Sequence, residues 1–197
     1  LPDDHPLILG MTGFWGTKFI NDTCRGADWI LGLGTRFSEA DCSSWENEYT
    51  FSFPPTKLIQ IDIDPSEIGR NYPVAIGAVA DLKQALEVLN RVARKLAPKG
   101  VKRDKLLAEM DRNRKAFVAG NAKAMKSDAW PMRPERILAD LREVLPRDAI
   151  LCTDVGWNKN GVGQQFPVDD PDSFITPGGF STMGFGPAAV LGVVTAG

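Results

Sequence analysis

The stretch from Lys57 to Pro65 places the strongest constraint on the fold. It reads Lys-Leu-Ile-Gln-Ile-Asp-Ile-Asp-Pro, so it is β-branched, nearly continuously apolar and closed by a proline. A short run of this kind predicts a strand that is buried on both faces of a sheet. Apolar runs at residues 7–10, 28–34 and 74–79 predict further strands.

Helical patterns separate these strands. Thr17 can cap a helix that continues to about Arg25, and Asp81 can cap a helix whose apolar residues recur every three or four positions up to Leu96. This alternation predicts an α/β fold with a doubly wound, Rossmann-like parallel sheet. Ligands bind such sheets at the carboxyl ends of the strands, which are expected at Gly10–Gly16, Gly32–Arg36 and Asp62–Asp64.

The beginning of a second α/β unit follows. Residues 101–131 are rich in charged and small side chains and predict a solvated helix or linker. Arg133-Pro134 then opens a helix, and the runs 149–154 and 173–175 predict two more strands. The apolar helical pattern near Gly197 is unfinished and the chain has no initiator Met, so we expect a fragment of a longer protein. The expected domains are residues 1–97, incomplete at the start, a linker at 98–131, and a truncated domain at 132–197.

Charge and cysteine content exclude several classes of protein. The net charge is −2, with acids interspersed among the bases, which does not favour nucleic-acid binding. The cysteines, Cys24, Cys42 and Cys152, have neither metal-ligand spacing nor an even number, and His5 is the single histidine. No apolar run is long enough to span a membrane, and the first residues are not a signal peptide. We therefore expect a cytoplasmic protein without a nucleic-acid or membrane partner.

A glycine-rich stretch at residues 177–189 is a candidate ligand loop. Four glycines fall between residues 178 and 186, where positive φ or close approach to a ligand would require them. Pro187 and the small residues after it predict the start of a helix. The same pattern also fits an ordinary strand-to-helix loop, so the residue types alone leave both interpretations open.

The carboxylates at the strand ends also allow two interpretations each. Gly32-x-Gly34 is half of a dinucleotide fingerprint, but Phe37 replaces its third glycine and Asp62 comes too late, so an NAD-dependent dehydrogenase is disfavoured. Asp62 is either a ribose ligand or, with Asp64, part of the turn at Pro65.

Two further charged residues also allow two interpretations each. Arg36 either neutralises a phosphate or pairs with Glu39 or Asp41. Asp154, followed by Gly156, suits a diphosphate or metal-proximal loop, or else the N-cap of a helix from about Trp157.

Five stretches in order resemble the thiamine-diphosphate-dependent enzymes of acetolactate synthase (acetohydroxyacid synthase) type. The resemblance covers nearly the whole chain in the family's order and spacing. Its pieces are Asp4–Met11, Ala27–Phe37, Ile59–Gly69, Thr153–Gly156 and Gly178–Gly186.

The resemblance implies a fold, a reaction and a set of site residues. Residues 1–97 would form most of a central nucleotide-binding-like domain, and 132–197 would begin a thiamine-diphosphate-binding domain. The parent enzyme would be a transferase that decarboxylates a 2-keto acid and passes the two-carbon unit to a second keto acid. Met183 would support the bent cofactor and the Ser181 carbonyl would accept from its aminopyrimidine. The remaining implied cofactor residues are Asp154, Val155, Gly156, Trp157, Asn158 and Gly179 for thiamine diphosphate, and Gly10, Met11, Arg36, Asp62, Ile63 and Asp81 for FAD.

The resemblance also implies what the 197 residues do not contain. The Mg²⁺ ligands and the glutamate that activates the cofactor would lie outside this chain, so the chain alone is expected to be inactive. The full-length enzyme would be a homo-oligomer, at least a dimer. The chain departs from the family pattern at Thr12, Ser38–Ala40, Trp157-Asn158 and Ser181. The alternatives are a non-enzymatic FAD- or ADP-binding module and a related acyltransferase or decarboxylase of the same superfamily.

Overall fold

The computed structural model describes residue 3 and residues 5–196, so the expectations that fall on Asp4 and Gly197 lie outside the described residues. The fold is mixed α/β with parallel strands, which confirms the predicted fold class. Two compact units divide the chain. Met11–Asp104 is called the three-stranded unit, and Leu1–Gly10 with Lys105–Gly197 is called the two-stranded unit.

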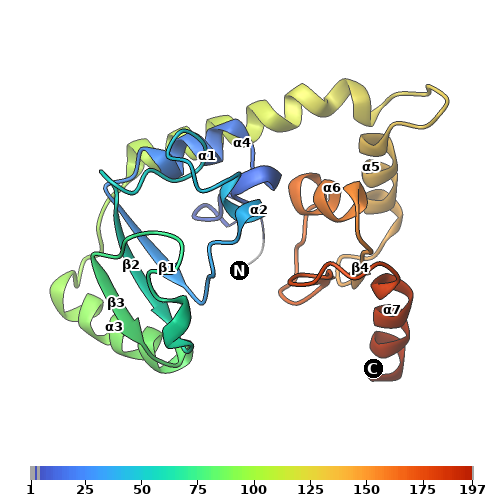
Figure 1. Ribbon diagram of the computed structural model, residues 1–197. Helices are drawn as coiled ribbons and strands as arrows, with labels where there is room; N and C mark the ends of the chain where they lie inside the picture. The colour runs from blue at the N-terminus through green and yellow to red at the C-terminus, as the bar shows by residue number, and fades with distance from the viewer. Residues whose placement is uncertain (1–2, 4, 197) are drawn as a thin grey trace. The chain divides into compact units, whose positions relative to one another are not determined.

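A parallel sheet in the order β1-β2-β3 forms the three-stranded unit (Figure 1). The strands are β1 (Trp29–Leu33), β2 (Lys57–Asp62) and β3 (Ile76–Val79). The predicted central strand is confirmed, but β2 ends at Asp62 and Ile63 is already 70% exposed.

Helical elements precede, connect and follow these strands. The predicted caps are confirmed: Thr17 Oγ1 accepts from the Ile20 amide at 3.4 Å, and Asp81 Oδ1 accepts from the Gln84 amide at 3.1 Å. Both caps satisfy amides that have no partner within their own helix. The helical elements are η1 (Gly13–Trp15), α1 (Lys18–Arg25), α2 (Glu39–Cys42), η2 (Pro65–Glu67) and α3 (Leu82–Leu96).

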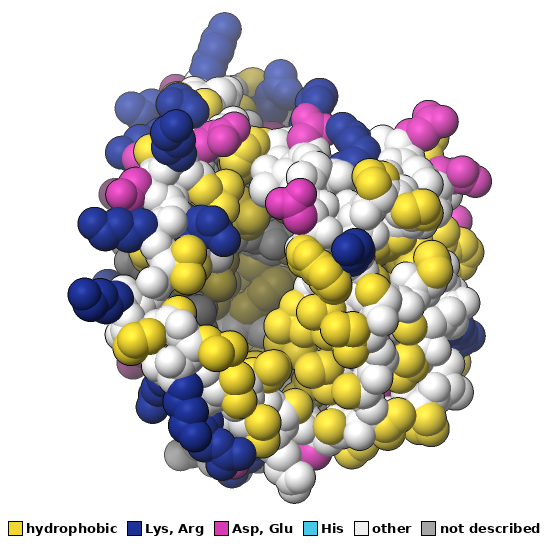
Figure 2. Space-filling view, turned by 90° about the vertical axis from the view of Figure 1, so that its left-hand side faces the viewer, with side chains coloured by type: hydrophobic (Ala, Val, Ile, Leu, Met, Phe, Trp, Pro, Cys, Tyr) yellow, Lys and Arg dark blue, Asp and Glu magenta, His cyan; other side chains and the backbone are white. Residues whose placement is uncertain are grey.

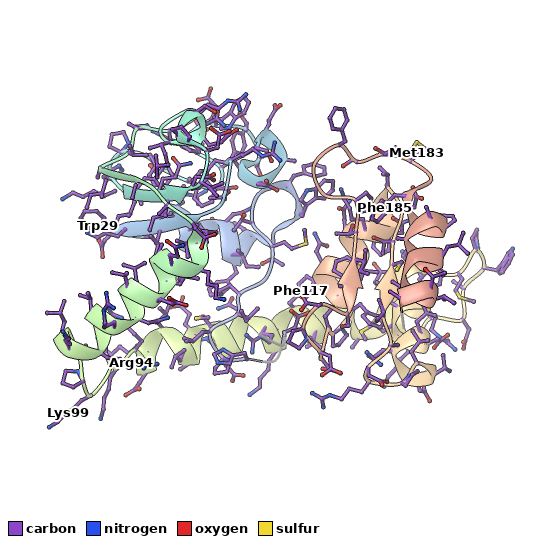
Figure 3. The ribbon with its side chains drawn as sticks, turned by 90° about the horizontal axis from the view of Figure 1, so that it is seen from below. Trp29, Arg94, Lys99, Phe117, Met183 and Phe185 are labelled. Carbon is purple, nitrogen blue, oxygen red and sulfur yellow. The ribbon has the colours of Figure 1, made fainter. Side chains whose placement is uncertain are left out.

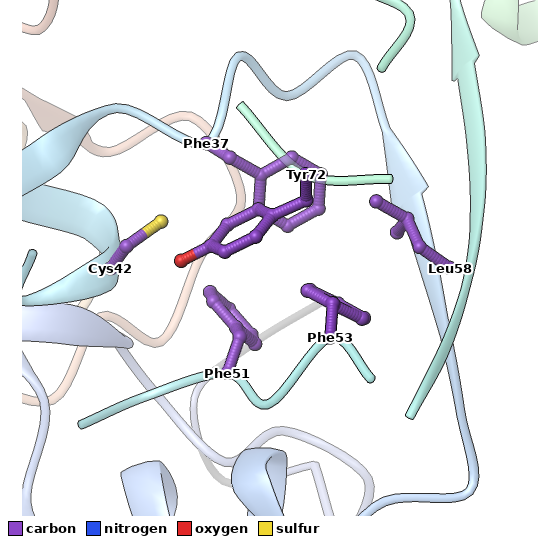
Figure 4. Packing of buried hydrophobic residues seen from close by; sticks show 6 residues of the cluster. All are labelled: Phe37, Cys42, Phe51, Phe53, Leu58 and Tyr72. Atoms are coloured by element: carbon purple, nitrogen blue, oxygen red, sulfur yellow. The ribbon is translucent and has the colours of Figure 1, made fainter. Parts of the chain in front are cut away.

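An aromatic cluster forms the core of the three-stranded unit (Figure 4). The ring of Phe37 packs edge-on against the rings of Phe51, Phe53 and Tyr72, with centroids 5.5, 6.2 and 5.6 Å away. The Tyr72 hydroxyl points toward the Cys42 thiol (Figure 4). Burial raises the pKa of the Cys42 thiol to about 11.

The two-stranded unit is mostly helical, and residues 104–125 form a helix within the stretch expected to be a solvated helix or a linker. Its sheet has the parallel strands β4 (Leu151–Cys152) and β5 (Phe174–Ile175). Leu138, Val162 and Phe166 form its buried core. The helices are α4 (Asp104–Met125), α5 (Pro134–Val144), α6 (Trp157–Gln165) and α7 (Phe185–Ala196).

The strand predicted at residues 7–10 is wrong. These residues have no strand structure, and Leu7 is 63% exposed. The carbonyl of Ile8 instead accepts a hydrogen bond of 2.5 Å from the guanidinium of Arg114 on α4. This contact ties the loop at residues 7–10 to α4.

Many apolar side chains of the three-stranded unit remain exposed. The helix α3 shows the predicted apolar spacing, yet Leu86, Leu89 and Val92 on that stripe are exposed. Hydrophobic side chains are correspondingly abundant on the surface shown in Figure 2. Within the described part of the chain, the helices are too short or too polar to cross a membrane.

Candidate functional site

The carboxyl ends of β4 and β5 lie side by side and place two sequence motifs together. The Thr153 amide donates to the Ile175 carbonyl at 3.0 Å, and the hydroxyls of Thr153 and Thr176 are 3.0 Å apart. Asp154 follows at the end of β4, and the glycine-rich loop follows β5. The loop and the Asp-Val-Gly turn therefore leave the sheet at the same edge.

Asp154 connects this turn to the loop. Its Oδ1 accepts from the Val155 amide at 2.7 Å, both carboxylate oxygens lie 3.0 Å from the Gly184 amide, and Oδ2 accepts from the Gly186 amide at 2.9 Å. These amides, with Val155 contributing most, hold the pKa of Asp154 below its usual range. Asp154 is therefore a carboxylate that binds backbone amides.

The interpretation of Asp154 as the N-cap of α6 is wrong. Gly156 occupies that position with φ +125°, and no side chain caps the helix. Asp154 instead binds amides at the start of α7, where amides lack partners within the helix and the helix dipole favours negative charge. The helix α7 begins at Phe185, two residues before the predicted start at Pro187, and the Gly186 amide in its first turn donates to Asp154 Oδ2.

Lys159 is a site residue that the sequence analysis missed. Its ammonium group lies 3.4 Å from the carbonyl oxygen of Pro177 and 3.2 Å from Ser181 Oγ. The Ser181 hydroxyl also lies 3.3 Å from the Gly178 carbonyl oxygen. A lysine in the first turn of a helix that follows an Asp-x-Gly turn is the available sequence signal, but its partners lie about one helix and one strand further along the chain.

The glycine-rich loop exposes its apolar side chains. Met183 is 80% exposed and Phe180 is fully exposed, although both are large and apolar. Figure 3 shows Met183 on the loop that precedes α7, and Phe185 at the start of α7. Gly179 is exposed beside Phe180, and Ser181 adopts φ +49°, a left-handed conformation that a non-glycine residue adopts at some cost.

The turn after β4 and the first turn of α6 form the other side of the site. Val155 is partly buried, whereas Gly156, Trp157 and Asn158 are exposed. The Trp157 ring lies over Gly161, where an added Cβ would come within 2.3 Å of it. This glycine therefore determines how closely the indole packs on its own helix.

A second group of predicted residues lies at the strand ends of the three-stranded unit. Asp62 is buried, and its Oδ1 accepts from the Asp64 amide at 3.0 Å. Asp64 in turn accepts from the Ser66 amide at 2.8 Å and caps η2, which confirms the turn interpretation for Asp64. Ala80 donates its amide to the Asp62 carbonyl at 2.9 Å, so Asp81 lies next to this strand end.

Arg36 and Ile63 lie at the same end of the sheet and are exposed. The ion pairs found among the described residues do not include Arg36, so its predicted pairing with Glu39 or Asp41 is not formed. The Asn71 amide group donates to the backbone carbonyl of Arg36 at 2.8 Å, which orients the loop and leaves the guanidinium outward.

Gln60 is a buried polar residue whose importance the sequence did not reveal. It is 2% exposed, and its amide nitrogen donates to the carbonyls of Thr35 at 3.1 Å and Glu67 at 2.9 Å. Its Oε1 accepts from the Gly69 amide at 2.9 Å. One side chain thus fixes the loops that follow β1 and β2. The polar residue within an apolar strand was the available signal.

Gly10 and Met11 fall at the boundary between the two units. Gly10 has φ +108°, which favours glycine. The carbonyl oxygen of Met11 lies so close to Gly16 that an added Cβ there would be 2.6 Å from it. Thr12, which departs from the family pattern, donates its hydroxyl to the Asp41 carbonyl at 3.1 Å.

The backbone around the two-stranded site is open to solvent at three glycines. An added Cβ on Gly156, Gly178 or Gly184 would meet nothing within 4 Å, so the surface beside these backbones is free. Met183 is exposed as well, so its side chain and these backbone groups are accessible to a ligand. Among the described residues, no three or more His, Cys, Asp or Glu side chains are grouped so that they could hold a metal ion. The described residues therefore supply no complete Mg²⁺ ligand set.

Comparison with known proteins supports the resemblance drawn from the motifs. Residues 1–89 match the family model for the thiamine pyrophosphate enzyme central domain. The chain is 35% identical over 201 residues to a probable acetolactate synthase large subunit of Methanocaldococcus jannaschii, covering 99% of this chain and 32% of that protein.

Two other relatives show similar coverage. The acetolactate synthase large subunit of Haemophilus influenzae is 31% identical over 192 residues, covering 98% of this chain and 32% of that protein. The glyoxylate carboligase of Escherichia coli O157:H7 is 29% identical over 199 residues, covering 100% and 32%. The chain spans about a third of the length of the curated relatives it matches.

Proposed function

Because residues 1–89 match the family model for the central domain of thiamine pyrophosphate enzymes, we propose that this chain is part of a thiamine-diphosphate-dependent carboligase of acetolactate synthase type. Its substrates are 2-keto acids, one of which is decarboxylated and transferred as a two-carbon unit to the other. The contact of the Asp154 carboxylate with the amides of Gly184 and Gly186 carries the proposal, since it joins two of the family motifs in one site.

In this proposal the cofactor binds at the carboxyl ends of β4 and β5. Thiamine diphosphate supplies a thiazolium carbon on which keto acids are decarboxylated, and the protein binds and orients it. Met183 and the carbonyl of Ser181 hold the cofactor's rings, with Gly179 close beside them. Residues 155–158 line the diphosphate, and Asp154 shapes the site through the loop.

The proposal assigns the three-stranded unit to FAD. Arg36 and Ile63 are exposed at the strand ends and available to a ligand, and Met11 of the same unit belongs to the same proposed set. Asp62 and Asp81 each use one carboxylate oxygen on a backbone amide, which leaves the other oxygen for a ribose or ribityl hydroxyl. Flavin absorbance of a protein that contains this unit, and its loss in an Arg36→Ala variant, would support this assignment.

A chimeric enzyme tests the proposed activity. These 197 residues replace the aligned segment of the Methanocaldococcus jannaschii relative, and the purified chimera is assayed with pyruvate, thiamine diphosphate and Mg²⁺. We expect formation of acetolactate that depends on thiamine diphosphate and falls at least tenfold in the Met183→Ala variant. A folded chimera that binds thiamine diphosphate but releases no carbon dioxide from pyruvate would contradict the proposal.

The similarity to a glyoxylate carboligase supports a second candidate substrate. The same chimera is therefore assayed with glyoxylate in place of pyruvate. Turnover of glyoxylate alone would favour that member of the superfamily, whereas turnover of pyruvate favours the acetolactate synthase type.

The 197-residue chain alone is proposed to have no carboligase activity, in line with the described residues, which hold no group of three or more His, Cys, Asp or Glu side chains for a metal ion. Calorimetric titration with thiamine diphosphate and Mg²⁺ should show no saturable heat. Binding in the micromolar range would contradict this part of the proposal. The complete enzyme is proposed to be a cytoplasmic homo-oligomer, which the mass of the native full-length protein tests.

A further inference from the structure

We propose that Asp154 and Lys159 are positioning residues that hold the two halves of the 177–186 loop and so present Met183 at a fixed place between them. The loop's attachment follows from contacts within the two-stranded unit. Only the identity of the group that meets Met183 rests on the proposed function.

Asp154 holds the second half of the loop. The Gly184 amide lies 3.0 Å from both of its oxygens, and the Gly186 amide lies 2.9 Å from Oδ2. A carboxylate suits this role because both of its oxygens accept hydrogen bonds, whereas an asparagine would present an NH₂ group to one of the amides. Hydrogen bonds to a charged acceptor are also stronger than neutral ones.

The glycines of this half make the contact possible. Gly184 has φ +91°, a conformation that L side chains rarely adopt. An added Cβ on Gly186 would lie 3.4 Å from Asp154 Oδ2 and 3.3 Å from its amide nitrogen, tighter than most real contacts. Both glycines therefore let the backbone approach the carboxylate, in addition to any role beside a ligand.

Lys159 holds the first half. From the first turn of α6 its ammonium group reaches the Pro177 carbonyl oxygen at 3.4 Å and the Ser181 hydroxyl at 3.2 Å. The Ser181 hydroxyl also lies 3.3 Å from the Gly178 carbonyl oxygen. The Lys159 ammonium group therefore contacts residues on both sides of Phe180. The contacts with Lys159 and with Gly178 both involve Ser181, a residue that adopts φ +49° although it is not a glycine.

Lys159 and Asp154 contact different segments of the loop, and neither of these contacts involves Met183. Lys159 contacts residues 177 and 181, and Asp154 contacts residues 184 and 186. Met183 lies between these attachment points and is 80% exposed. Holding a flexible segment at both ends lowers the entropy that its ordering by a ligand would otherwise cost.

Hydrogen exchange of the 197-residue chain, without cofactor, tests the part assigned to Asp154. In Asp154→Asn we expect the Gly184 and Gly186 amides to exchange about tenfold faster, because their acceptor is weakened. The β4–β5 ladder amides of Leu151 and Thr153 serve as internal references and should keep their protection. Asp148→Asn, which changes an exposed carboxylate on the turn before β4, is the matched control.

Chymotrypsin cleavage after Phe180 tests the part assigned to Lys159. We expect Lys159→Met to be cleaved at least threefold faster than wild type, and Lys159→Arg, which can donate to the same oxygens, to restore slow cleavage. Lys126→Met controls for loss of a lysine elsewhere in the same unit.

The outcomes separate this inference from the proposed function. Unchanged exchange at Gly184 and Gly186 in Asp154→Asn, or an equal increase at Leu151 and Thr153, would overturn the role of Asp154. Cleavage of Lys159→Met at the wild-type rate, or failure of Lys159→Arg to restore it, would overturn the role of Lys159. Both measurements are made without cofactor, so their results do not depend on the activity of the chimera.

Discussion

The packing of Phe37 against Gly32 gives a quantitative test of the aromatic core. Phe37 is 5% exposed, and three aromatic rings pack edge-on around it. Replacing a buried phenylalanine by alanine costs about 3–5 kcal/mol in general. We expect Phe37→Ala to fall in the upper half of that range, since aromatic pairs add about 0.5–1.5 kcal/mol beyond buried area. Alanine and phenylalanine share the backbone cost of φ +47°, so that contribution cancels.

Gly32, which lies against the Phe37 ring, allows the packing to be tested with a second substitution. A Cβ added to Gly32 would lie 2.8 Å from Cζ and 2.9 Å from Cε2 of the Phe37 ring. Gly32→Ala alone should therefore cost about 1–3 kcal/mol by overpacking. In the Phe37→Ala background most of this cost should disappear, because the ring that causes the clash is gone. We expect a coupling free energy of at least about 1 kcal/mol in a double-mutant cycle.

Urea unfolding of the four proteins measures this cycle. Far-UV circular dichroism gives the free energies, and hydrogen exchange of β2 amides assigns the transition to the three-stranded unit. Phe180→Ala, which removes a fully exposed ring, is the control and should change stability by less than about 0.5 kcal/mol. Additive effects of Gly32→Ala and Phe37→Ala, or a cost of Phe37→Ala no larger than that of Phe180→Ala, would refute the packing argument.

Three further predictions concern single side chains. Because burial raises the pKa of Cys42 to about 11, iodoacetamide at pH 8 should label it at least 100-fold more slowly in the folded chain than in urea, as counted by mass spectrometry. Gln60→Leu should cost at least about 2 kcal/mol in urea unfolding because it strips partners from buried loop groups, whereas Gln84→Leu on exposed α3 should cost little. The amides of Val155, Gly186 and Gly184 lower the pKa of Asp154, so its hold on the loop should be complete above about pH 4. It should be lost only as the pH falls further, and loss of Gly186 amide protection already at pH 5 would contradict this.

Local patterns were enough to predict the elements whose stability depends on near neighbours. The run at Lys57–Pro65 became the central strand β2, and Thr17 and Asp81 cap their helices as expected. Pro134 opens α5 at its first position. In each case the deciding interaction lies within about four residues or within one apolar run, so the sequence contains the information directly.

Contacts between distant segments decided what the sequence alone left open. The sequence determined an α/β chain with parallel strands, and it contains both a glycine-rich loop and an Asp-Val-Gly turn. The apolar run at residues 7–10 fits a strand, but Arg114, 106 residues away, uses the Ile8 carbonyl and holds the run as a loop. Asp154 fits a cap of the next helix, but the start of α7 lies against it, so it binds amides 30 and 32 residues away. The sequence around a carboxylate or a carbonyl does not indicate which distant donor will bind it. That pairing depends on the path of the chain through the fold, which brings donor and acceptor together.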